Sequence, residues 1–426
     1  MAIPWRTGAV VPKLMVISTS LPGTRHGGGV IQDAILQGYP RDRYVCVSLR
    51  PPDWETMGGN TPASLAGVPC LVAPVTPEPR WRGARFYLPV VRAWGFFLAA
   101  PWRVRQAVAF GKRHGVDLVW GEFQGEALLL AAGVAAGLKA PLVGTIWDDP
   151  EGWLADARYD CLSRRLLLLR FREALHAARQ VSTVSEAMQA DYRRRYGLKS
   201  VILRYGHDLE DAVGEAQNSN PENTVVGFAG TVYGEDAWRS FLAACVRINA
   251  AGRLPPIKIR IFGNEGFPYP HPGVEVICEG WLPRQEMLRR LAAVDFCYLP
   301  YWFAPDKRRH AELSFPTKLT TYIAAGRPVL YHGPTWAFAH EVMQRWQVGA
   351  GAHSLDPEEI SWVIIRVSLD EPLKKTFSLA SRQAFEQEFN SGVMLGNFLK
   401  LISQEPPPHS INRQNPDRNA TLCRHA

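Results

Sequence analysis

Short apolar runs of strand length alternate with longer helical segments along most of the chain, and this alternation limits the folds that the chain can adopt. The helical segments include residues 125–137, which are rich in Ala and Leu. The pattern predicts a parallel sheet with helices on both faces, because each strand must be followed by a crossover before the next one begins. In the first half, the predicted strands are residues 13–20, 44–49, 69–73, 117–120, 141–147, 180–184 and 200–203.

A polar segment at residues 209–223 divides the chain. It contains Gly214 and Pro221, which are typical of a linker between domains. A chain of 426 residues exceeds one ordinary core, so we predict two domains. Predicted strands resume at residues 224–229, 257–262, 274–278, 294–299 and 328–331. The predicted parts are an N-terminal domain (1–208), the linker (209–223), a C-terminal domain (224–376), helices that return to the first domain (377–403) and a disordered tail (404–426).

Residues 311–334 combine a helix start with a positive charge. Pro316 suits the first turn of a helix, Ser314 is predicted to cap this helix, and Gly326 is predicted to end it. The free backbone N–H groups of a helix start favour an anion, and Lys318 adds a full charge. The segment therefore favours a phosphate site, and an ordinary helix and strand of an α/β domain is the alternative.

The same residues resemble the nucleotide-sugar segment of GT-B glycosyltransferases, in particular the retaining family 4 group. The shared positions are Phe315, Pro316, Gly326, Pro328 and Val329. Residues 280–283, Gly-Trp-Leu-Pro ahead of a helical run, resemble a second motif of that family. The resemblance covers residues 13–400, and it implies an α/β fold with two Rossmann-like domains facing across a cleft.

This resemblance implies a glycosyltransferase of hexosyltransferase type that moves a sugar from a nucleotide diphosphate sugar to an acceptor hydroxyl, with retention. The nucleotide sugar is the donor substrate, and no other cofactor and no metal is implied. By resemblance and position, the expected nucleotide-sugar residues are Gly28, Gly29, Gly230, Thr231, Gly263, Leu282, Ser314, Phe315, Pro316, Lys318 and Thr321. The expected catalytic residues are Asp148 and Glu312.

Gly27, Gly28 and Gly29 follow the first predicted strand, and we expect a helix to begin after them at Val30. Glycines at such a turn let the backbone approach a ligand closely, so they are a candidate second phosphate contact. The fingerprint G-x-G-x-x-G is absent, and a simple tight turn is the alternative.

Carboxylates follow the predicted strand at residues 141–147. Ligands of parallel sheets bind beyond the carboxyl ends of the strands, so Asp148 is a candidate to accept a proton or to stabilise positive charge on the sugar. For Asp149, capping of the following helix is the preferred interpretation.

The chain also departs from the family pattern. Many members carry two glutamates near the donor sugar and the ribose, and this chain has Leu313 and Thr321 at those positions. Residues 230–234 lack the Arg and Lys that members often place in that loop, so Lys318, Arg308 or Arg309 would supply the charge. A catalytically silent binding or partner protein of GT-B type is therefore an alternative, and a sugar-nucleotide epimerase is a third hypothesis.

The segment that begins at Arg80 and ends at Arg113 holds eight Arg or Lys and no acidic residue, interleaved with aromatic residues. Such a surface suits an anionic membrane that carries a glycan or lipid-linked acceptor, and a half-buried helix pair with solvated Arg residues is the alternative. No nucleic-acid motif accompanies the charge, so nucleic acid is not expected as a partner.

The seven cysteines show no C-x-x-C spacing, which favours reduced packing residues over a disulfide framework or a zinc site. No apolar run reaches the length of a membrane span. We expect a cytoplasmic protein that functions in polysaccharide biosynthesis and lies peripherally on the inner face of the membrane.

Overall fold

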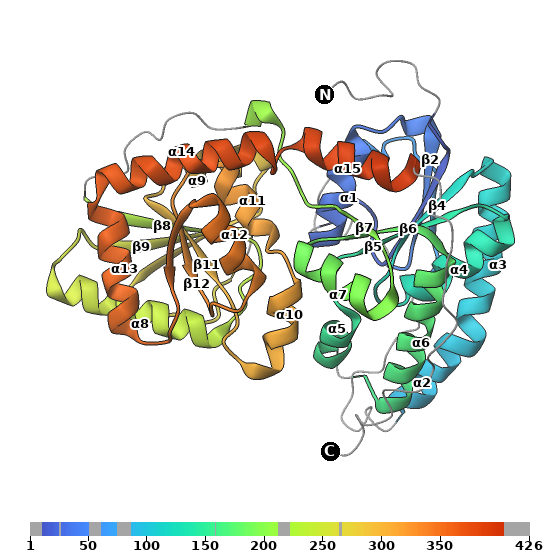
Figure 1. Cartoon of the computed structure of the whole chain (residues 1–426), viewed down its shortest axis with the longest axis horizontal. Helices are drawn as coiled ribbons and strands as arrows, with labels where there is room; N and C mark the ends of the chain where they lie inside the picture. The colour runs from blue at the N-terminus through green and yellow to red at the C-terminus, as the bar shows by residue number, and fades with distance from the viewer. Residues whose placement is uncertain are drawn as a thin grey trace.

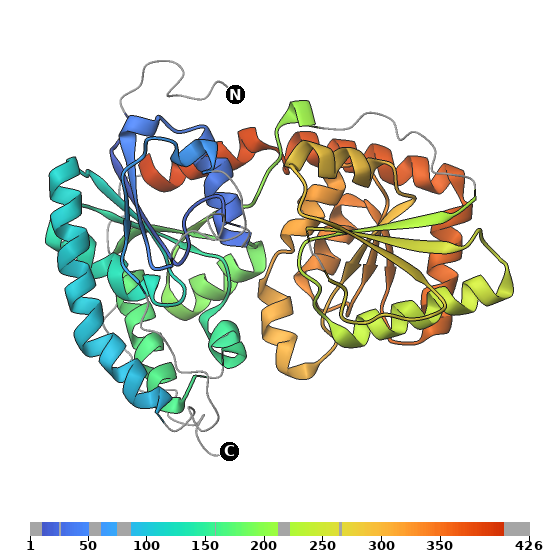
Figure 2. The same ribbon diagram turned by 180° about the vertical axis from the view of Figure 1, so that it is seen from behind.

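A computed structural model describes residues 11–24, 27–50, 61–74, 87–157, 159–211, 222–263 and 266–403. The chain forms two α/β lobes that lie next to each other (Figure 1). Seen from behind, the short helix α10 (Arg308–Leu313) of the second lobe lies at the junction with the first (Figure 2).

The first lobe is built on a seven-stranded parallel sheet with the order β3-β2-β1-β4-β5-β6-β7. The strands lie in the order that a doubly wound sheet requires, with the direction of winding reversed between β1 and β4. The strand bounds are β1 (Leu14–Ser18), β2 (Tyr44–Ser48), β3 (Cys70–Val72), β4 (Leu118–Glu122), β5 (Leu142–Ile146), β6 (Ala178–Thr183) and β7 (Ser200–Ile202). The main helices are α1 (Gly27–Gln37), α2 (Leu88–Trp94), α3 (Ala100–His114), α4 (Ala127–Leu138), α5 (Pro150–Asp156), α6 (Cys161–Ala177) and α7 (Glu186–Tyr196).

The second lobe repeats the plan with a six-stranded parallel sheet, in the order β10-β9-β8-β11-β12-β13. Its winding reverses between β8 and β11. The strand bounds are β8 (Thr224–Ala229), β9 (Ile257–Phe262), β10 (Glu275–Gly280), β11 (Phe296–Pro300), β12 (Val329–His332) and β13 (Gly349–Ala352). Beside α10, the helices are α8 (Glu235–Ala251), α9 (Arg284–Ala292), α11 (Thr317–Ala324), α12 (Phe338–Trp346), α13 (Pro357–Leu369), α14 (Glu371–Gln387) and α15 (Ser391–Ser403).

These two sheets confirm the predicted α/β fold, and every predicted strand is present within a few residues of its expected bounds. β13 is the strand that the sequence did not reveal, because its residues, Gly-Ala-Gly-Ala, carry almost no side chain. The small residues have a structural reason at Gly349, since a Cβ at this position would lie 1.9 Å from the carbonyl oxygen of Val329.

The chain crosses between the lobes twice, and the two crossings lie against each other. In the first, His207 pairs with Asn390 of the second in an isolated bridge, and the Ser391 amide donates to the His207 carbonyl at 2.7 Å. Beyond this point α15 packs against α1, β6 and β7 of the first lobe. The C-terminal helix therefore belongs spatially to the first sheet.

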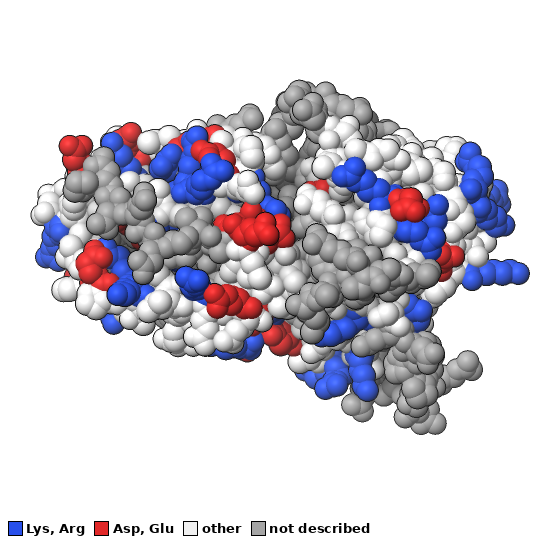
Figure 3. All heavy atoms as spheres, turned by 90° about the horizontal axis from the view of Figure 1, so that it is seen from above, with Lys and Arg blue, Asp and Glu red and all other residues white. Residues whose placement is uncertain are grey.

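A long, almost continuous helix lies along the outer edge of the first lobe (Figure 1). It consists of α2, a π-helical turn at Gly95–Ala99, and α3. Seen from above, the outer edge of this lobe carries groups of Lys and Arg with few acidic residues near them (Figure 3).

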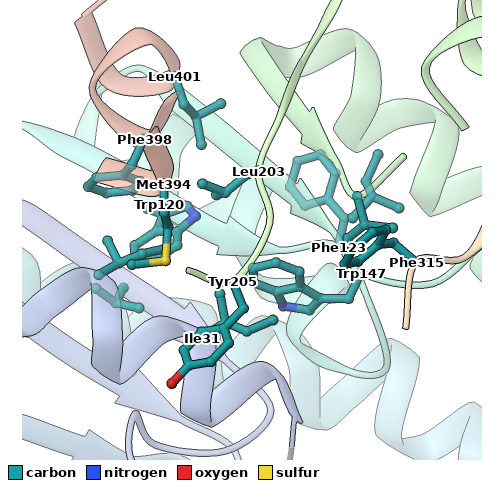
Figure 4. Close-up of a cluster of buried hydrophobic side chains, with 14 of the residues drawn as sticks. Ile31, Trp120, Phe123, Trp147, Leu203, Tyr205, Phe315, Met394, Phe398 and Leu401 are labelled. Carbon is teal, nitrogen blue, oxygen red and sulfur yellow. The ribbon is translucent and has the colours of Figure 1, made fainter. Parts of the chain in front are cut away.

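One apolar cluster runs from the first lobe into the second (Figure 4). Trp120 of β4 lies 4.6 Å from Phe398 of α15, measured between ring centroids, and both are buried. Near the junction, Trp147 and Phe315 bring the two lobes into the same cluster. The burial of this apolar surface is the main force that holds the returning helix in place.

We predict that Phe398→Ala lowers the free energy of unfolding of the first lobe by about 3 kcal/mol or more, because a fully buried ring is lost and a cavity remains. Hydrogen exchange of the β4 and α15 amides measures this change. Leu379→Ala on α14 is the matched control, since Leu379 is exposed and its loss should change little. Equal protection in both variants would contradict the anchoring role of Phe398.

Candidate active site

Glycines with a left-handed backbone end three neighbouring strands of the second lobe. Gly230 follows β8, Gly263 follows β9 and Gly280 ends β10, with φ values of 82°, 81° and 69°. Residues with a side chain rarely adopt this conformation, so glycine is required for these turns. The predicted site glycines Gly230 and Gly263 thus lie together at the carboxyl edge of the sheet, beside the point where the winding reverses.

Lys318 lies next to this edge, since a Cβ on Gly230 would be 3.5 Å from its Nζ. Its ammonium donates to the carbonyl of Thr231 at 2.9 Å and lies 4.3 Å from the centre of the Tyr233 ring. Burial lowers the pKa of Lys318 to about 7. Among the described residues it has no carboxylate partner, so its charge is left to be balanced by a ligand.

The start of α11 differs from the prediction in one detail. The N-cap is Pro316, and Ser314 does not cap the helix; instead Ser314 ends α10 and shares a hydrogen bond with the Tyr301 hydroxyl at 3.0 Å. The prediction was wrong because a second short helix, α10, ends directly before α11. Phe315 is buried and stacks on Phe389, which fixes the direction in which the helix start faces.

Two further predicted residues are held by structural contacts. Thr321 is buried, and its hydroxyl lies 3.1 Å from Nε2 of His207 in the crossing segment. Leu282 follows β10 and packs on the apolar core. Their part in nucleotide binding stays a prediction.

A line of aromatic contacts leads from Lys318 to the first lobe. Tyr233 stacks on Trp302 at 4.7 Å, and Trp302 contacts the His310 ring edge-on at 4.8 Å. His310 of α10 reaches Asp148, with 3.8 Å between Nε2 and Oδ1. Lys318 and the sheet edge beside it are called the cation site below. The candidate catalytic residue Asp148 is therefore connected to this site across the junction of the lobes.

Asp148 and Asp149 have separate surroundings. Asp148 accepts a hydrogen bond from the Gln124 amide at 3.3 Å and is about one-third exposed. Asp149 is buried and caps α5 by accepting from the Glu151 amide, which confirms the predicted capping.

A second acidic group, which the sequence did not reveal, lies nearby in the first lobe. Glu122 ends β4 at the point where the winding reverses, and its carboxylate accepts the Thr19 amide at 2.7 Å. Burial raises the pKa of Glu122 to about 7. A Cβ placed on Gly28 of α1 would lie 3.4 Å from Oε1 of Glu122.

The glycine-rich segment forms the first turn of α1, which begins at Gly27 and not at Val30 as predicted. The helix gains these residues because Gly29 packs into the preceding turn, where its carbonyl accepts the Gly23 amide at 2.9 Å. A Cβ at Gly29 would lie 2.2 Å from the Thr24 hydroxyl, so close packing accounts for this glycine.

The other candidate catalytic residue, Glu312, is engaged on the surface. Its carboxylate accepts from Arg308 of the same helix at 2.7 Å, and both side chains are more than one-third exposed. Its catalytic role stays a prediction. Arg308 and Arg309, named above as alternative phosphate partners, are both paired with carboxylates, whereas Lys318 has no carboxylate partner among the described residues and stays the preferred candidate.

Arg309 joins the lobes. Its guanidinium donates twice to Asp149, at 2.9 and 3.0 Å, and once to Asp191 at 2.8 Å. Burial opposes the charge, but the bonds to these carboxylates outweigh it and raise the pKa of Arg309. A fork of this kind fixes direction as well as distance, so α10 is held in one orientation against the first lobe.

The predicted basic surface is only partly present. The segment up to residue 86 lies outside the described residues. Further along, Arg92 and Arg103 are buried and pair with Asp160 and Glu126. The exposed side of the helix from α2 to the start of α3 carries an apolar stripe, formed by Val90, Trp94, Phe97, Leu98 and Trp102, and exposed basic residues occur only later in α3.

Within the described ranges, no helix has the length and apolar character needed to cross a membrane. The same part of the chain contains no cluster of three or more His, Cys, Asp or Glu that could hold a metal ion.

Comparison with known proteins matches part of the chain to one domain family and most of it to solved structures of one fold. Residues 37–205 match the family model of the glycosyl transferase 4-like domain. HepE of Anabaena, solved with UDP and glucose, is 16% identical, with a TM-score of 0.64 over 92% of this chain and 100% of its own. The sucrose-phosphate synthase of Thermosynechococcus elongatus is 13% identical, with a TM-score of 0.61 over 91% and 97% of the two chains. WaaG, a glycosyltransferase involved in lipopolysaccharide biosynthesis, is 13% identical, with a TM-score of 0.57 over 92% and 100%. No curated protein sequence matches this chain.

We predict that Arg309→Met lowers the free energy of unfolding by at least about 2 kcal/mol, because Asp149 would stay buried without its hydrogen-bonded charged partner and would keep Arg195, at 3.9 Å, as its cationic neighbour. Arg308→Met is the matched control on the same helix, and the loss of its exposed pair should cost about 0.5 kcal/mol. Thermal unfolding of the two variants measures the difference. Equal losses would show that the Arg309 pair does not hold the lobes together.

Proposed function

We propose that the chain is a glycosyltransferase of the GT-B type that transfers a sugar from a UDP-sugar to an acceptor hydroxyl with retention; the match of residues 37–205 to a glycosyl transferase 4-like domain and the fold shared with HepE support this. The observation that carries the proposal is Lys318, a half-buried cation without a carboxylate partner among the described residues, at the start of α11. UDP and UDP-glucose are the ligands named for HepE, which has the same fold.

The proposed chemistry is electrostatic. Lys318 and the amides at the start of α11 bind the diphosphate and stabilise the negative charge that grows on it as it leaves. The acceptor oxygen bonds to the anomeric carbon, while the bond from that carbon to the phosphate oxygen breaks and its electrons leave with UDP. The acceptor proton passes to the departing phosphate. Asp148 is proposed to stabilise positive charge on the sugar.

We predict that Lys318→Met weakens UDP-glucose binding by about 10-fold or more, since a hydrogen bond to a charged group is lost. In the unmodified protein, affinity should be constant below pH 7 and should fall as pH rises above it, because the pKa of free Lys318 is about 7 and only the charged form binds well. The variant should lack this decline.

Titration calorimetry at several pH values measures both effects. Lys258→Met is the control, because Lys258 lies at the opposite end of β9 and pairs with Glu275. Unchanged affinity in Lys318→Met would remove the start of α11 from the donor site.

The apolar stripe supports a lipid-linked or membrane-borne glycan acceptor. Its aromatic residues Trp94, Phe97 and Trp102 are 51%, 58% and 54% exposed. Arg105, Lys112 and Arg113 continue the exposed side of the same helix. Aromatic and basic side chains on one helix suit the headgroup region of an anionic bilayer, so we propose that this side lies on such a membrane.

We predict that the double change Trp94→Ser and Phe97→Ser lowers the affinity for vesicles containing phosphatidylglycerol by roughly tenfold or more, since each ring loses about 1 kcal/mol of apolar burial. Vesicle co-sedimentation measures the affinity. Trp362→Ser is the control, because Trp362 is 62% exposed but lies on α13 of the other lobe. Equal binding of all forms, or equal binding to neutral vesicles, would refute the membrane surface.

A further inference from the structure

A small polar site lies in the first lobe where β1, β4, β5 and α1 meet. A Cβ placed on Gly28 would lie 3.2 Å from the indole nitrogen of Trp147 and 3.4 Å from Oε1 of Glu122. The space beside Gly28 is thus bounded by one N–H donor and one carboxyl oxygen. Any side chain at position 28 would enter this space.

The indole N–H is the unexplained group of this site. Trp147 is 7% exposed, and its Nε1 has no hydrogen-bond partner among the residues that the structure describes. A buried donor without a partner costs free energy, so its retention needs a reason. A ligand that accepts this hydrogen bond supplies one.

The neighbouring carboxyl decides which ligand class fits. Glu122 is 9% exposed and already accepts the Thr19 amide, with one oxygen next to Gly28. A carboxylate here repels phosphate, which disfavours the diphosphate contact predicted for Gly28. A hydroxyl fits, because its oxygen can accept from Trp147 while its hydrogen is donated to Glu122.

The site also lies on the same side as the cation site. The contacts from Lys318 through Tyr233, Trp302 and His310 end at Asp148, the residue that follows Trp147. Gln124, two residues after Glu122, binds Asp148 from the first lobe. An acceptor held at Gly28 would therefore face the donor across the junction of the lobes.

We propose that Glu122, Trp147 and Gly28 form the binding site for a hydroxyl group of the sugar acceptor. This inference rests on the proposed transfer reaction and names the residues that would hold one acceptor hydroxyl. Glu122 and Trp147 act here by binding and positioning the hydroxyl.

The test uses the full chain and octyl glycosides of glucose, galactose and mannose as hydroxyl-bearing probes. Binding is measured by saturation-transfer NMR, with and without UDP, and UDP binding is measured separately by calorimetry. Gly28→Ala should weaken binding of the preferred glycoside tenfold or more because the methyl group fills the site, and Trp147→Phe should weaken it by removing the donor. UDP affinity should not change in either variant.

Gly396→Ala is the matched control, because Gly396 also lies in a helix and a Cβ there would have no neighbour within 4 Å. It should bind the glycosides and UDP like the unmodified protein. The Ala substitution at residue 28 is expected to fold, since Ala is a better helix former than Gly.

The pH dependence gives an independent readout. Burial raises the pKa of Glu122 to about 7, with the charge of Asp148 acting in the same direction and the Thr19 amide and Arg50 opposing it. Glycoside binding should therefore strengthen as pH rises through about 7, because the carboxylate accepts the hydroxyl hydrogen. Glu122→Gln should bind without this dependence.

The outcomes separate the two proposals. The hydroxyl site would be overturned if the unmodified protein did not bind the glycosides. It would also be overturned if Gly28→Ala and Trp147→Phe bound them as tightly as the unmodified protein. Loss of UDP affinity in Gly28→Ala would also overturn it and would indicate that Gly28 belongs to the donor site. Absence of UDP binding by the unmodified protein would count against the proposed donor only, because glycoside binding is also measured without UDP.

Discussion

The contact between Arg309 and Asp149 determines how the two lobes face each other. Asp149 starts α5 and accepts the Tyr192 hydroxyl at 3.1 Å, so its position is fixed within the first lobe. Arg309 belongs to α10. The next residue of this helix, His310, contacts Trp302 and Asp148. The same short helix therefore joins the lobes and connects the cation site to the acidic residues. A change in its orientation would alter both sites together.

The two lobes differ in the charge that they bring to this junction. The second lobe contributes a half-buried ammonium at a glycine-lined sheet edge, which suits an anion. The first lobe contributes Glu122 and Asp148, which disfavour an anion and suit hydroxyl groups. Burial favours the neutral forms of Lys318 and Glu122. It lowers the pKa of Lys318 to about 7 and raises the pKa of Glu122 to about 7. A nucleotide diphosphate would stabilise the charged form of Lys318, and a sugar hydroxyl would stabilise the charged form of Glu122.

The fold could be predicted because strands buried on both faces must be almost wholly apolar, and such runs are visible in a sequence. Lys318 could be chosen as a candidate for a similar reason, since a helix start and its charge are local features. Glu122 could not, because nothing near it in the sequence distinguishes it; its partners Thr19 and Gly28 lie about a hundred positions away. The Arg309 contact spans 160 positions and was missed in the same way. The Ser314 cap failed because two helices meet where the pattern indicated one.

The structure explains the residues at two positions where this chain departs from the family that it resembles. Leu313 is buried, and its carbonyl accepts the Ser185 hydroxyl of the first lobe. Thr321 contacts His207, which burial keeps neutral by lowering its pKa to about 3. A glutamate at position 321 would place a carboxylate beside this ring and favour its charged form, at the cost of burying an ion pair. Both positions thus serve the junction of the lobes. If Lys318 binds a diphosphate as proposed, the next polar side chains along the line of aromatic contacts are His310 of the second lobe and Asp148 of the first, so one ligand would contact both lobes.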